Sequence, residues 1–197
     1  MEYLICNNGA IVVTGSIDLT GTKLPELPRF GMRMELHQPY ENLTYYGRGP
    51  FENYIDRYSG AFIGRYEDKV ENQFYWYIRP QETGNKTDVR WLTLLDSGGL
   101  GVKITGLQPI SFSALHFSPE DLDPGLTRKL QHTIDIVPQK NIFLHVDLKQ
   151  RGLGGDNSWG MYPHNEYRLL DKKYTYSYMI ELVEKGSDKN DYLNSRK

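Results

Sequence analysis

The sequence predicts an all-β protein built as a sandwich of antiparallel sheets. About a dozen short segments alternate apolar and polar residues, with turn residues between them. The chain is rich in aromatic residues, with 15 Tyr, 7 Phe and 3 Trp, and these residue types favour strands. Only one short helix start is recognisable. No repeat or change of composition divides the 197 residues, so we expect one domain.

The first strands follow from local apolar patterns. Residues 10–19 carry branched apolar side chains and end at Thr-Gly-Thr. Residues 24–31 contain two prolines and form a connector that cannot be helical. In residues 32–36 apolar and charged side chains alternate, which predicts a half-buried strand, and residues 42–46 are its expected partner.

The middle of the chain continues in the same way. Residues 61–66 form another candidate strand. Residues 74–78 (Phe-Tyr-Trp-Tyr-Ile) are apolar on both faces, so we expect a buried strand there. Three strands follow at 89–96, 102–107 and 110–117, and a glycine-rich turn joins the first two.

The one helix start is Ser118-Pro119-Glu120-Asp121, where a capping serine precedes proline and two acids. Pro124-Gly125 follows, so the helix must be short. Two hairpins complete the predicted sheets: residues 133–137 with 142–148, and residues 167–170 with 174–184. We therefore expect a domain at 25–184, an unassigned segment or first strands at 1–24, and a polar tail at 185–197.

Charge and apolar patterning exclude several classes of partner. There are 23 basic and 25 acidic residues, so no basic surface for nucleic acid is expected. No apolar run approaches the roughly 18 residues of a membrane span. The single cysteine, Cys6, excludes an internal disulfide. No signal peptide is visible, and the compartment stays open between bacterial cytoplasm and periplasm.

A glycine-rich motif follows the half-buried strand at 142–148. Three glycines in four residues precede Asp156, Asn157, Ser158 and Trp159. Glycine allows positive φ and close backbone approach, so the chain can fold sharply here. An aromatic face with hydrogen-bonding neighbours suits a sugar ring. The alternative is a bend whose tryptophan fills the core.

The loop at residues 46–57 carries ionic groups without a strand or helix period. Glu52, Asp56 and Arg57 either pair with one another and the loop backbone or contact a ligand. A retaining glycosidase needs two carboxylates about 5–5.5 Å apart across its substrate. Spacing in the sequence cannot establish that geometry, and an ion-pair network is the simpler interpretation.

No other catalytic set is apparent. No serine lies in a strained nucleophile turn, and no phosphate-binding glycine loop precedes a helix. The histidines have no metal-ligand spacing and are expected to be hydrogen-bonded sheet residues. They are His37, His116, His132, His145 and His164.

Three motifs carry a family resemblance. The first motif, Gly47–Arg57, closely resembles the G-x-G-P-x-E-N-Y-x-D-R signature of large family 2 β-galactosidases. The second motif, Pro80–Asn85 with Val89-Arg90-Trp91, is similar to that family's next signature. The third motif, Gly152–Trp159, is similar to the signature near its C-terminus. The motifs occur in the family's order, and the resemblance covers roughly residues 25 to 184.

The resemblance implies the C-terminal, small-chain domain of a β-galactosidase, with the galactose mutarotase-like supersandwich fold of aldose 1-epimerases. Family enzymes hydrolyse terminal β-D-galactosides with retention, using two glutamates on a (β/α)₈ barrel. Such a barrel needs about 250 residues, so no catalytic residue is expected here. The implied partners are a β-galactoside or other carbohydrate, the barrel and other domains of the same polypeptide, and a homo-oligomer as an open alternative. No cofactor is expected in this domain, because family Mg and Na sites lie in other domains.

By the same resemblance, Trp159 matches a tryptophan that reaches into the mouth of the barrel's active site as an aromatic platform. Asp156 and Asn157 are expected beside it. Asn157 stands where some members carry a second acid, which should change only hydrogen bonding at the rim. The loop residues assigned to shaping the mouth, rather than to bond cleavage, are Gly49, Glu52, Asn53, Asp56 and Arg57.

Two other functions stay open. A free-standing aldose epimerase needs a general base and a general acid, for which His116 or His145 with Glu166 are candidates. His145 lies opposite the apolar stripe of its strand and could line a groove. The motifs favour the galactosidase. The third possibility is a purely structural domain in which Trp159 is buried.

Overall fold

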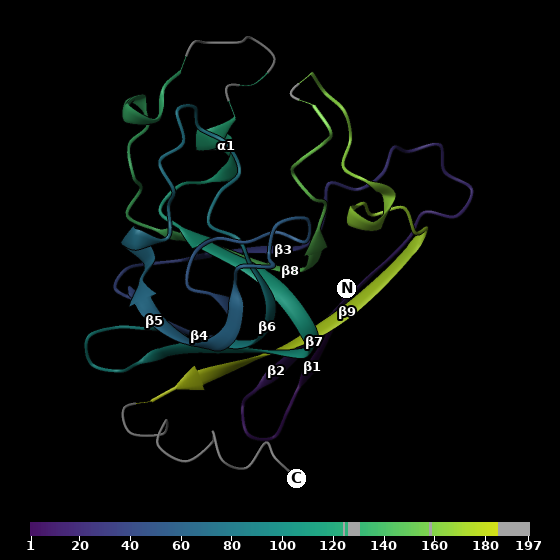
Figure 1. Cartoon of the computed structure of the whole chain (residues 1–197). Coiled ribbons are helices and arrows are strands. Elements are labelled where there is room, and N and C mark those ends of the chain that lie inside the picture. The colour runs from purple at the N-terminus through teal and green to yellow at the C-terminus, as the bar shows by residue number, and fades with distance from the viewer. Residues whose placement is uncertain (124, 126–130, 158, 185–197) are drawn as a thin grey trace.

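A computed structural model describes residues 1–123, 125, 131–157 and 159–184. Over these ranges the chain is almost entirely antiparallel β-sheet, which confirms the predicted all-β class (Figure 1). The strands are β1 (Glu2–Ile5), β2 (Ile11–Asp18), β3 (Arg29–Leu36), β4 (Asn42–Gly49), β5 (Phe62–Lys69), β6 (Lys86–Leu95), β7 (Gly101–Leu115), β8 (Ile142–Gln150) and β9 (Lys173–Val183). The helices are α1 (Pro119–Leu122) and three 3₁₀ turns, η1 (Val70–Asn72), η2 (Thr133–Asp135) and η3 (Asn165–Tyr167).

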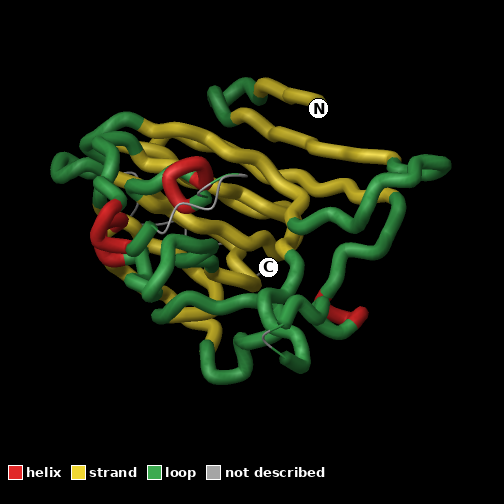
Figure 2. The backbone as a smooth tube through the Cα atoms, turned by 90° about the horizontal axis from the view of Figure 1, so that it is seen from above, coloured by secondary structure: helices red, strands yellow, loops and turns green. Residues whose placement is uncertain are grey.

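The sheet order is β1-β2-β9-β7-β6-β4-β5, and β8 and β3 branch from it. The branch point is the long strand β7. Its first part, Gly101–Gly106, pairs with β9, and its second part, Ser111–Leu115, pairs with β8. Strand β3 then pairs with the other edge of β8. Strand β7 is therefore shared by both layers of the sandwich: one continues from it into β9, and the other continues into β8 and β3. Figure 2 shows the β1–β2 hairpin at one edge of the sheet.

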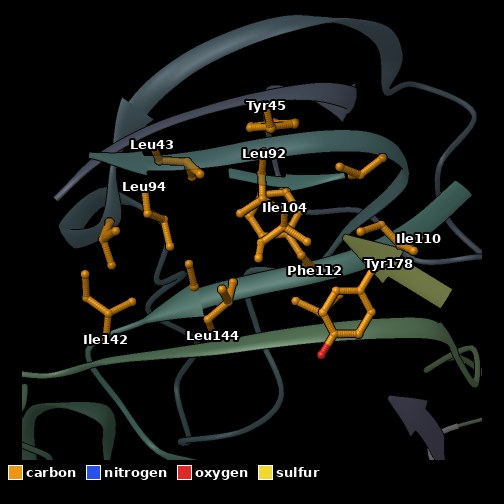
Figure 3. Close-up of a cluster of buried hydrophobic side chains, with 14 of the residues drawn as sticks. Leu43, Tyr45, Leu92, Leu94, Ile104, Ile110, Phe112, Ile142, Leu144 and Tyr178 are labelled. Atoms are coloured by element: carbon orange, nitrogen blue, oxygen red, sulfur yellow. The ribbon is translucent and has the colours of Figure 1, made fainter. Parts of the chain in front are cut away.

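The core lies between these two layers. Its side chains come from all the central strands and are at most 1% exposed (Figure 3): Leu43, Tyr45, Leu92, Leu94, Ile104, Ile110, Phe112, Ile142, Leu144 and Tyr178. Each fully buried side chain of this size contributes about 1.5–3 kcal/mol relative to leaving it in water. The buried hydroxyl of Tyr176 donates to the Val146 carbonyl at 2.9 Å. This packing makes the sheet a rigid base for the loops.

Several predicted pairings are wrong. Residues 32–36 do not pair with 42–46, because β5 and β6 occupy both edges of β4 and β3 lies on β8. The segments 102–107 and 110–117 form a single strand, β7. Its register against β6 shifts between Thr105 and Ile110, and the resulting bulge accommodates Pro109, which has no N–H to donate.

Residues 74–78 are not a buried strand. Phe74 alone is buried, in a small cluster with Phe117 and Leu122, while Trp76 is 58% and Ile78 87% exposed. No strand of the described residues pairs with this aromatic run, so Trp76 and Ile78 stay at the surface.

Neither of the two predicted hairpins forms. Residues 133–137 begin with the 3₁₀ turn η2, and η3 occupies the start of 167–170. Leu169 makes only an isolated bridge, to Leu27. The helix start, in contrast, is confirmed. The Ser118 hydroxyl accepts from the Asp121 N–H at 3.2 Å, and the Asp121 carboxylate accepts from the Ser118 N–H at 2.7 Å.

Two further differences from the predictions concern the burial of β8 and the number of strands at the edge of the main sheet. Strand β8 is buried on both faces, since Phe143 and Asp147 are covered as well as its apolar stripe. In the segment left unassigned, β1 and β2 extend the main sheet beyond β9. The polar tail at 185–197 lies outside the described residues. No helix among the described residues is long and apolar enough to cross a membrane.

Candidate functional site

The three sequence motifs meet above the sheet. The segment between β8 and β9 rises on the same side as α1 (Figure 1). Direct hydrogen bonds connect the first motif, at the end of β4, to the second and the third, as described below. The sequence could locate each motif, but it gave no sign that the first one links the other two.

Asn53 is the centre of this linkage and is fully buried. Its side-chain amide donates to the carbonyls of Arg48 and Phe51, both at 3.1 Å. Its Oδ1 accepts from the Thr87 N–H at 2.9 Å. The Asn53 backbone N–H donates to the Asn85 carbonyl, and the Asn85 side-chain amide donates to the Asn53 carbonyl, both at 2.8 Å. Asn53 thus fixes the first motif onto the second and is inaccessible to a ligand.

Glu52 is engaged in the same junction. Its carboxylate accepts from the Gly84 N–H at 2.7 Å and the Thr83 hydroxyl at 3.1 Å, and it forms close contacts with Arg57 and Tyr77. The predicted pairing of Glu52 with Arg57 is therefore found. Burial, followed by the hydrogen bond to Glu52, raises the pKa of Tyr77, so this hydroxyl stays protonated and donates.

Gly49 precedes the loop at a crowded position. A Cβ there would lie 2.1 Å from the Tyr45 hydroxyl and 2.9 Å from the Tyr66 ring. Glycine is therefore required for packing of the loop base.

Asp56 connects the first motif to the third. Its Oδ2 accepts from the Gly154 N–H at 2.7 Å. A Cβ on Gly152 would lie 2.7 Å from the Asp56 carboxyl carbon, and one on Gly155 would lie 2.3 Å from the Met161 carbonyl oxygen. These glycines are therefore needed for close approach, while positive φ occurs at Gly160. The predicted ion-pair network is therefore found only in part: Glu52 pairs with Arg57, whereas Asp56 accepts from a backbone N–H of the third motif.

Trp159 lies at the tip of the third motif and is 93% exposed. Its backbone N–H donates to Asn157 Oδ1 at 2.8 Å. Asp156 contacts His164 Nε2 at 2.8 Å, and this hydrogen bond raises the pKa of His164. The bend does not place its tryptophan in the core of this domain. The loop presents Asp156, Asn157 and Trp159 together at the surface.

The epimerase candidates are not brought together. His116 contacts Glu41 at 3.0 Å and the Asn141 carbonyl at 3.1 Å, beside one groove. His145 lines a separate cavity, and Glu166 lines a third. Burial and the charge of Arg29 lower the pKa of His145 to about 4, so it is neutral at neutral pH.

Comparison with known proteins identifies the family of this chain. A family model described as "Beta galactosidase small chain" matches residues 1–180. The chain belongs to the β-galactosidase small-chain family. The match includes the first strands, β1 and β2, as well as the three motifs.

Curated relatives are much longer than this small-chain domain. It is 36% identical to a β-galactosidase of Priestia megaterium over 182 residues, which is 92% of this chain and 17% of the relative. The β-galactosidase of Streptococcus thermophilus is 36% identical over 183 residues, with the same shares. Beta-galactosidase BgaC of Bifidobacterium adolescentis is 35% identical over 164 residues, 80% of this chain and 15% of the relative. The chain thus spans about one sixth of these relatives.

A buried ion cluster of the small-chain domain was not anticipated from the sequence. Arg29 lies 3.0 Å from the Asp147 carboxylate, 2.9 Å from Glu82 and 3.0 Å from His145. Gly31 allows this, because a Cβ there would lie 1.9 Å from Asp147 Oδ1. The cluster fixes Glu82 of the second motif onto β3 and β8. No group of three or more metal-ligating side chains occurs within the described ranges.

Asp147 gives the domain a specific pH response. Burial, opposed by Arg29, raises its pKa from 3.8 to about 7. Because the folded-state pKa is raised, its stabilising contribution is complete below about pH 4 and is lost as pH rises to about 7. We expect Asp147→Asn, which cannot ionise, to gain unfolding free energy relative to the unsubstituted chain across this interval. Urea unfolding at several pH values measures the difference, and a pH-independent difference would contradict the expectation.

Proposed function

We propose that this chain is the non-catalytic C-terminal domain of a family 2, retaining β-galactosidase, and that it completes the galactoside site by contributing Trp159. The observation that carries the proposal is the exposed indole at the end of a loop whose base is fixed. Asp56 holds Gly154, and Gly152 N–H donates to the Tyr167 carbonyl at 2.8 Å. Membership of the small-chain family supports the assignment.

We assign the residues of the first motif a structural role in this function rather than a catalytic one. Asn53 is buried and Glu52 is hydrogen-bonded within the domain, so neither is available to attack a glycosidic bond. The nucleophile and the acid/base are assigned to the remaining part of the polypeptide, together with any Mg or Na of the enzyme. Asp156 and Asn157 are proposed to hydrogen-bond sugar hydroxyls next to the indole.

Trp159→Ala in the full-length enzyme is expected to raise KM. Stacking on one aromatic ring contributes about 0.5–1.5 kcal/mol beyond burial, which corresponds to about a 2- to 12-fold change. Trp159→Tyr should recover most of the loss because it restores a flat ring. Steady-state kinetics with a galactoside whose aglycone is large would measure both variants.

The isolated chain of 197 residues is the negative control for this experiment. It should hydrolyse no chromogenic galactoside, and it should not accelerate mutarotation of freshly dissolved galactose in a polarimeter. If both kcat and KM are unchanged in Trp159→Ala, the domain is a scaffold and the proposal is wrong. Turnover by the isolated chain would also reject it.

A further inference from the structure

A hollow next to Trp159 carries an aromatic side chain that the proposed function does not use. We call it the Tyr162 hollow. It is open to solvent and has a volume of about 500 Å³, and ligand pockets usually have volumes of about 300–1,000 Å³. Gly160, which directly follows Trp159, lines it, so the hollow adjoins the indole loop. The lining side chains used in the argument are Asp156, Met161, Tyr162, His164, Glu166 and Arg168.

The ring of Tyr162 is held in place from within the domain. The guanidinium carbons of Arg168 and Arg151 lie 4.8 Å and 5.4 Å from the centre of this ring. Both arginines bind one carboxylate: Arg168 Nε lies 2.6 Å from Glu26 Oε2, and Arg151 Nη1 lies 3.0 Å from Glu26 Oε1. The Glu26 side chain is only 8% exposed, so the two cation–π contacts rest on a buried anchor. Tyr162 itself is 58% exposed and therefore presents a fixed aromatic surface to the hollow.

Polar groups surround this ring. Asp156 Oδ1 contacts His164 Nε2 at 2.8 Å, which keeps the carboxylate at the side of the hollow. The Glu166 carboxylate is exposed and forms no hydrogen bond within the part of the chain that the structure describes, so both of its oxygens can accept. A flat ring with carboxylate acceptors around it complements a sugar ring, which has apolar C–H faces and hydroxyl donors at its rim.

We propose that the Tyr162 hollow binds a further sugar unit on the leaving-group side of the galactoside, so that the preferred substrates contain three or more sugar units. This proposal rests on the proposed function, because it takes Trp159 and Asp156 as the start of the carbohydrate site. The galactose that is released is terminal, so every additional sugar is joined to the leaving group. Asp156 lies beside the indole in sequence and also lines the hollow, which makes the two surfaces continuous.

Two substrates that differ by one sugar test the proposal in the full-length enzyme. One is lactose, and the other is the trisaccharide in which a second glucose is β-linked to the reducing end of lactose. Loss of galactose from the trisaccharide leaves a disaccharide of glucose, which is not a galactoside, so released galactose reports a single cleavage. The unsubstituted enzyme should have a KM for the trisaccharide at least about 2-fold lower than for lactose, because one more sugar stacks on a ring.

Tyr162→Ala should remove this difference. We expect it to raise KM for the trisaccharide by about 2- to 12-fold, the effect of one stacking ring, and to leave KM for lactose unchanged. Tyr162→Phe is the matched variant and should behave like the unsubstituted enzyme, because it retains the ring. Tyr3→Ala removes a tyrosine of similar exposure, 62%, from β1 and should leave both KM values unchanged.

Three outcomes would overturn the proposal. Equal KM values for the two substrates in the unsubstituted enzyme mean that no sugar occupies the hollow, and this comparison needs no folded variant. A rise of KM for both substrates in Tyr162→Ala means that Tyr162 only positions the Trp159 loop. Unchanged KM values in Tyr162→Ala mean that the ring contacts no substrate.

Failure of the Tyr162 hollow is distinguishable from failure of the proposed function. Trp159→Ala should raise KM for lactose and for the trisaccharide alike. If it does so and Tyr162→Ala has no selective effect, only the additional sugar site is rejected. If Trp159→Ala leaves the kinetics of both substrates unchanged, the proposed function is rejected.

Discussion

Arg29→Met will lower the free energy of unfolding by about 3–5 kcal/mol, the usual cost of removing one partner from a buried ion pair. The Asp147 side chain is fully buried and lies 3.0 Å from the guanidinium, so above about pH 7, where Asp147 is ionised, loss of Arg29 leaves a carboxylate without a counter-charge. Glu82 loses its 2.9 Å contact in the same substitution. Methionine retains the length of the side chain, which limits the effect of a cavity.

Arg33→Met is the matched control because it removes the same charge from the same strand. Arg33 pairs with Glu120 at the surface, where the two side chains are 43% and 68% exposed. Exposed pairs contribute about 0–1 kcal/mol, so this variant should unfold close to the unsubstituted chain. Urea unfolding followed by circular dichroism compares the two. Equal losses would show that the buried cluster does not stabilise the fold.

Asn53→Ala is expected to cost about 2–4 kcal/mol, because it removes the partners of several backbone groups around a fully buried side chain, at about 1–3 kcal/mol for each group left unsatisfied away from water. The affected groups are the Thr87 N–H and the carbonyls of Arg48 and Phe51. Both the first and the second motif would loosen. In the full-length enzyme we therefore expect a loss of kcat/KM in addition to the loss of stability.

Asn72→Ala is the control for this substitution. Asn72 is exposed and donates to Asp68 at 2.8 Å on the surface. Surface substitutions of this kind change stability by less than about 0.5 kcal/mol. A thermal unfolding midpoint for Asn53→Ala that matched the Asn72→Ala value would contradict the central role given to Asn53.

The strands were predictable where the information is local. Alternation over five residues at 32–36 and seven at 142–148 identified β3 and β8, because a strand repeats every two residues, and a run of branched apolar residues identified β2. Pairing was not predictable in the same way, since it depends on which edges are free in the assembled sheet. Residues 74–78 illustrate the limit: five apolar residues in a row are compatible with a buried strand, and only the absence of a neighbouring strand leaves Trp76 and Ile78 exposed.

In the candidate site, too, local features were predictable from the sequence and long-range contacts were not. The motifs identified the loops, and the pairing of Glu52 with Arg57 was anticipated from their proximity in sequence. Asn53 looked like one more polar loop residue, although it is buried and joins two motifs. Arg29 stood at the end of a proline-rich connector, and its partner Asp147 is more than a hundred positions away. Contact of Trp159 with a galactoside stays a prediction.

The pairing of β2 with β9 has a consequence for biosynthesis. Ile11 has Ile180 as its partner, and Asp18 has Lys173. A nascent chain therefore exposes its early apolar strand long before the ribosome has made the segment that shields it. Pairing over such a separation is slow, and the waiting strand is vulnerable to association with other chains. We therefore expect this topology to make folding during translation depend on a chaperone.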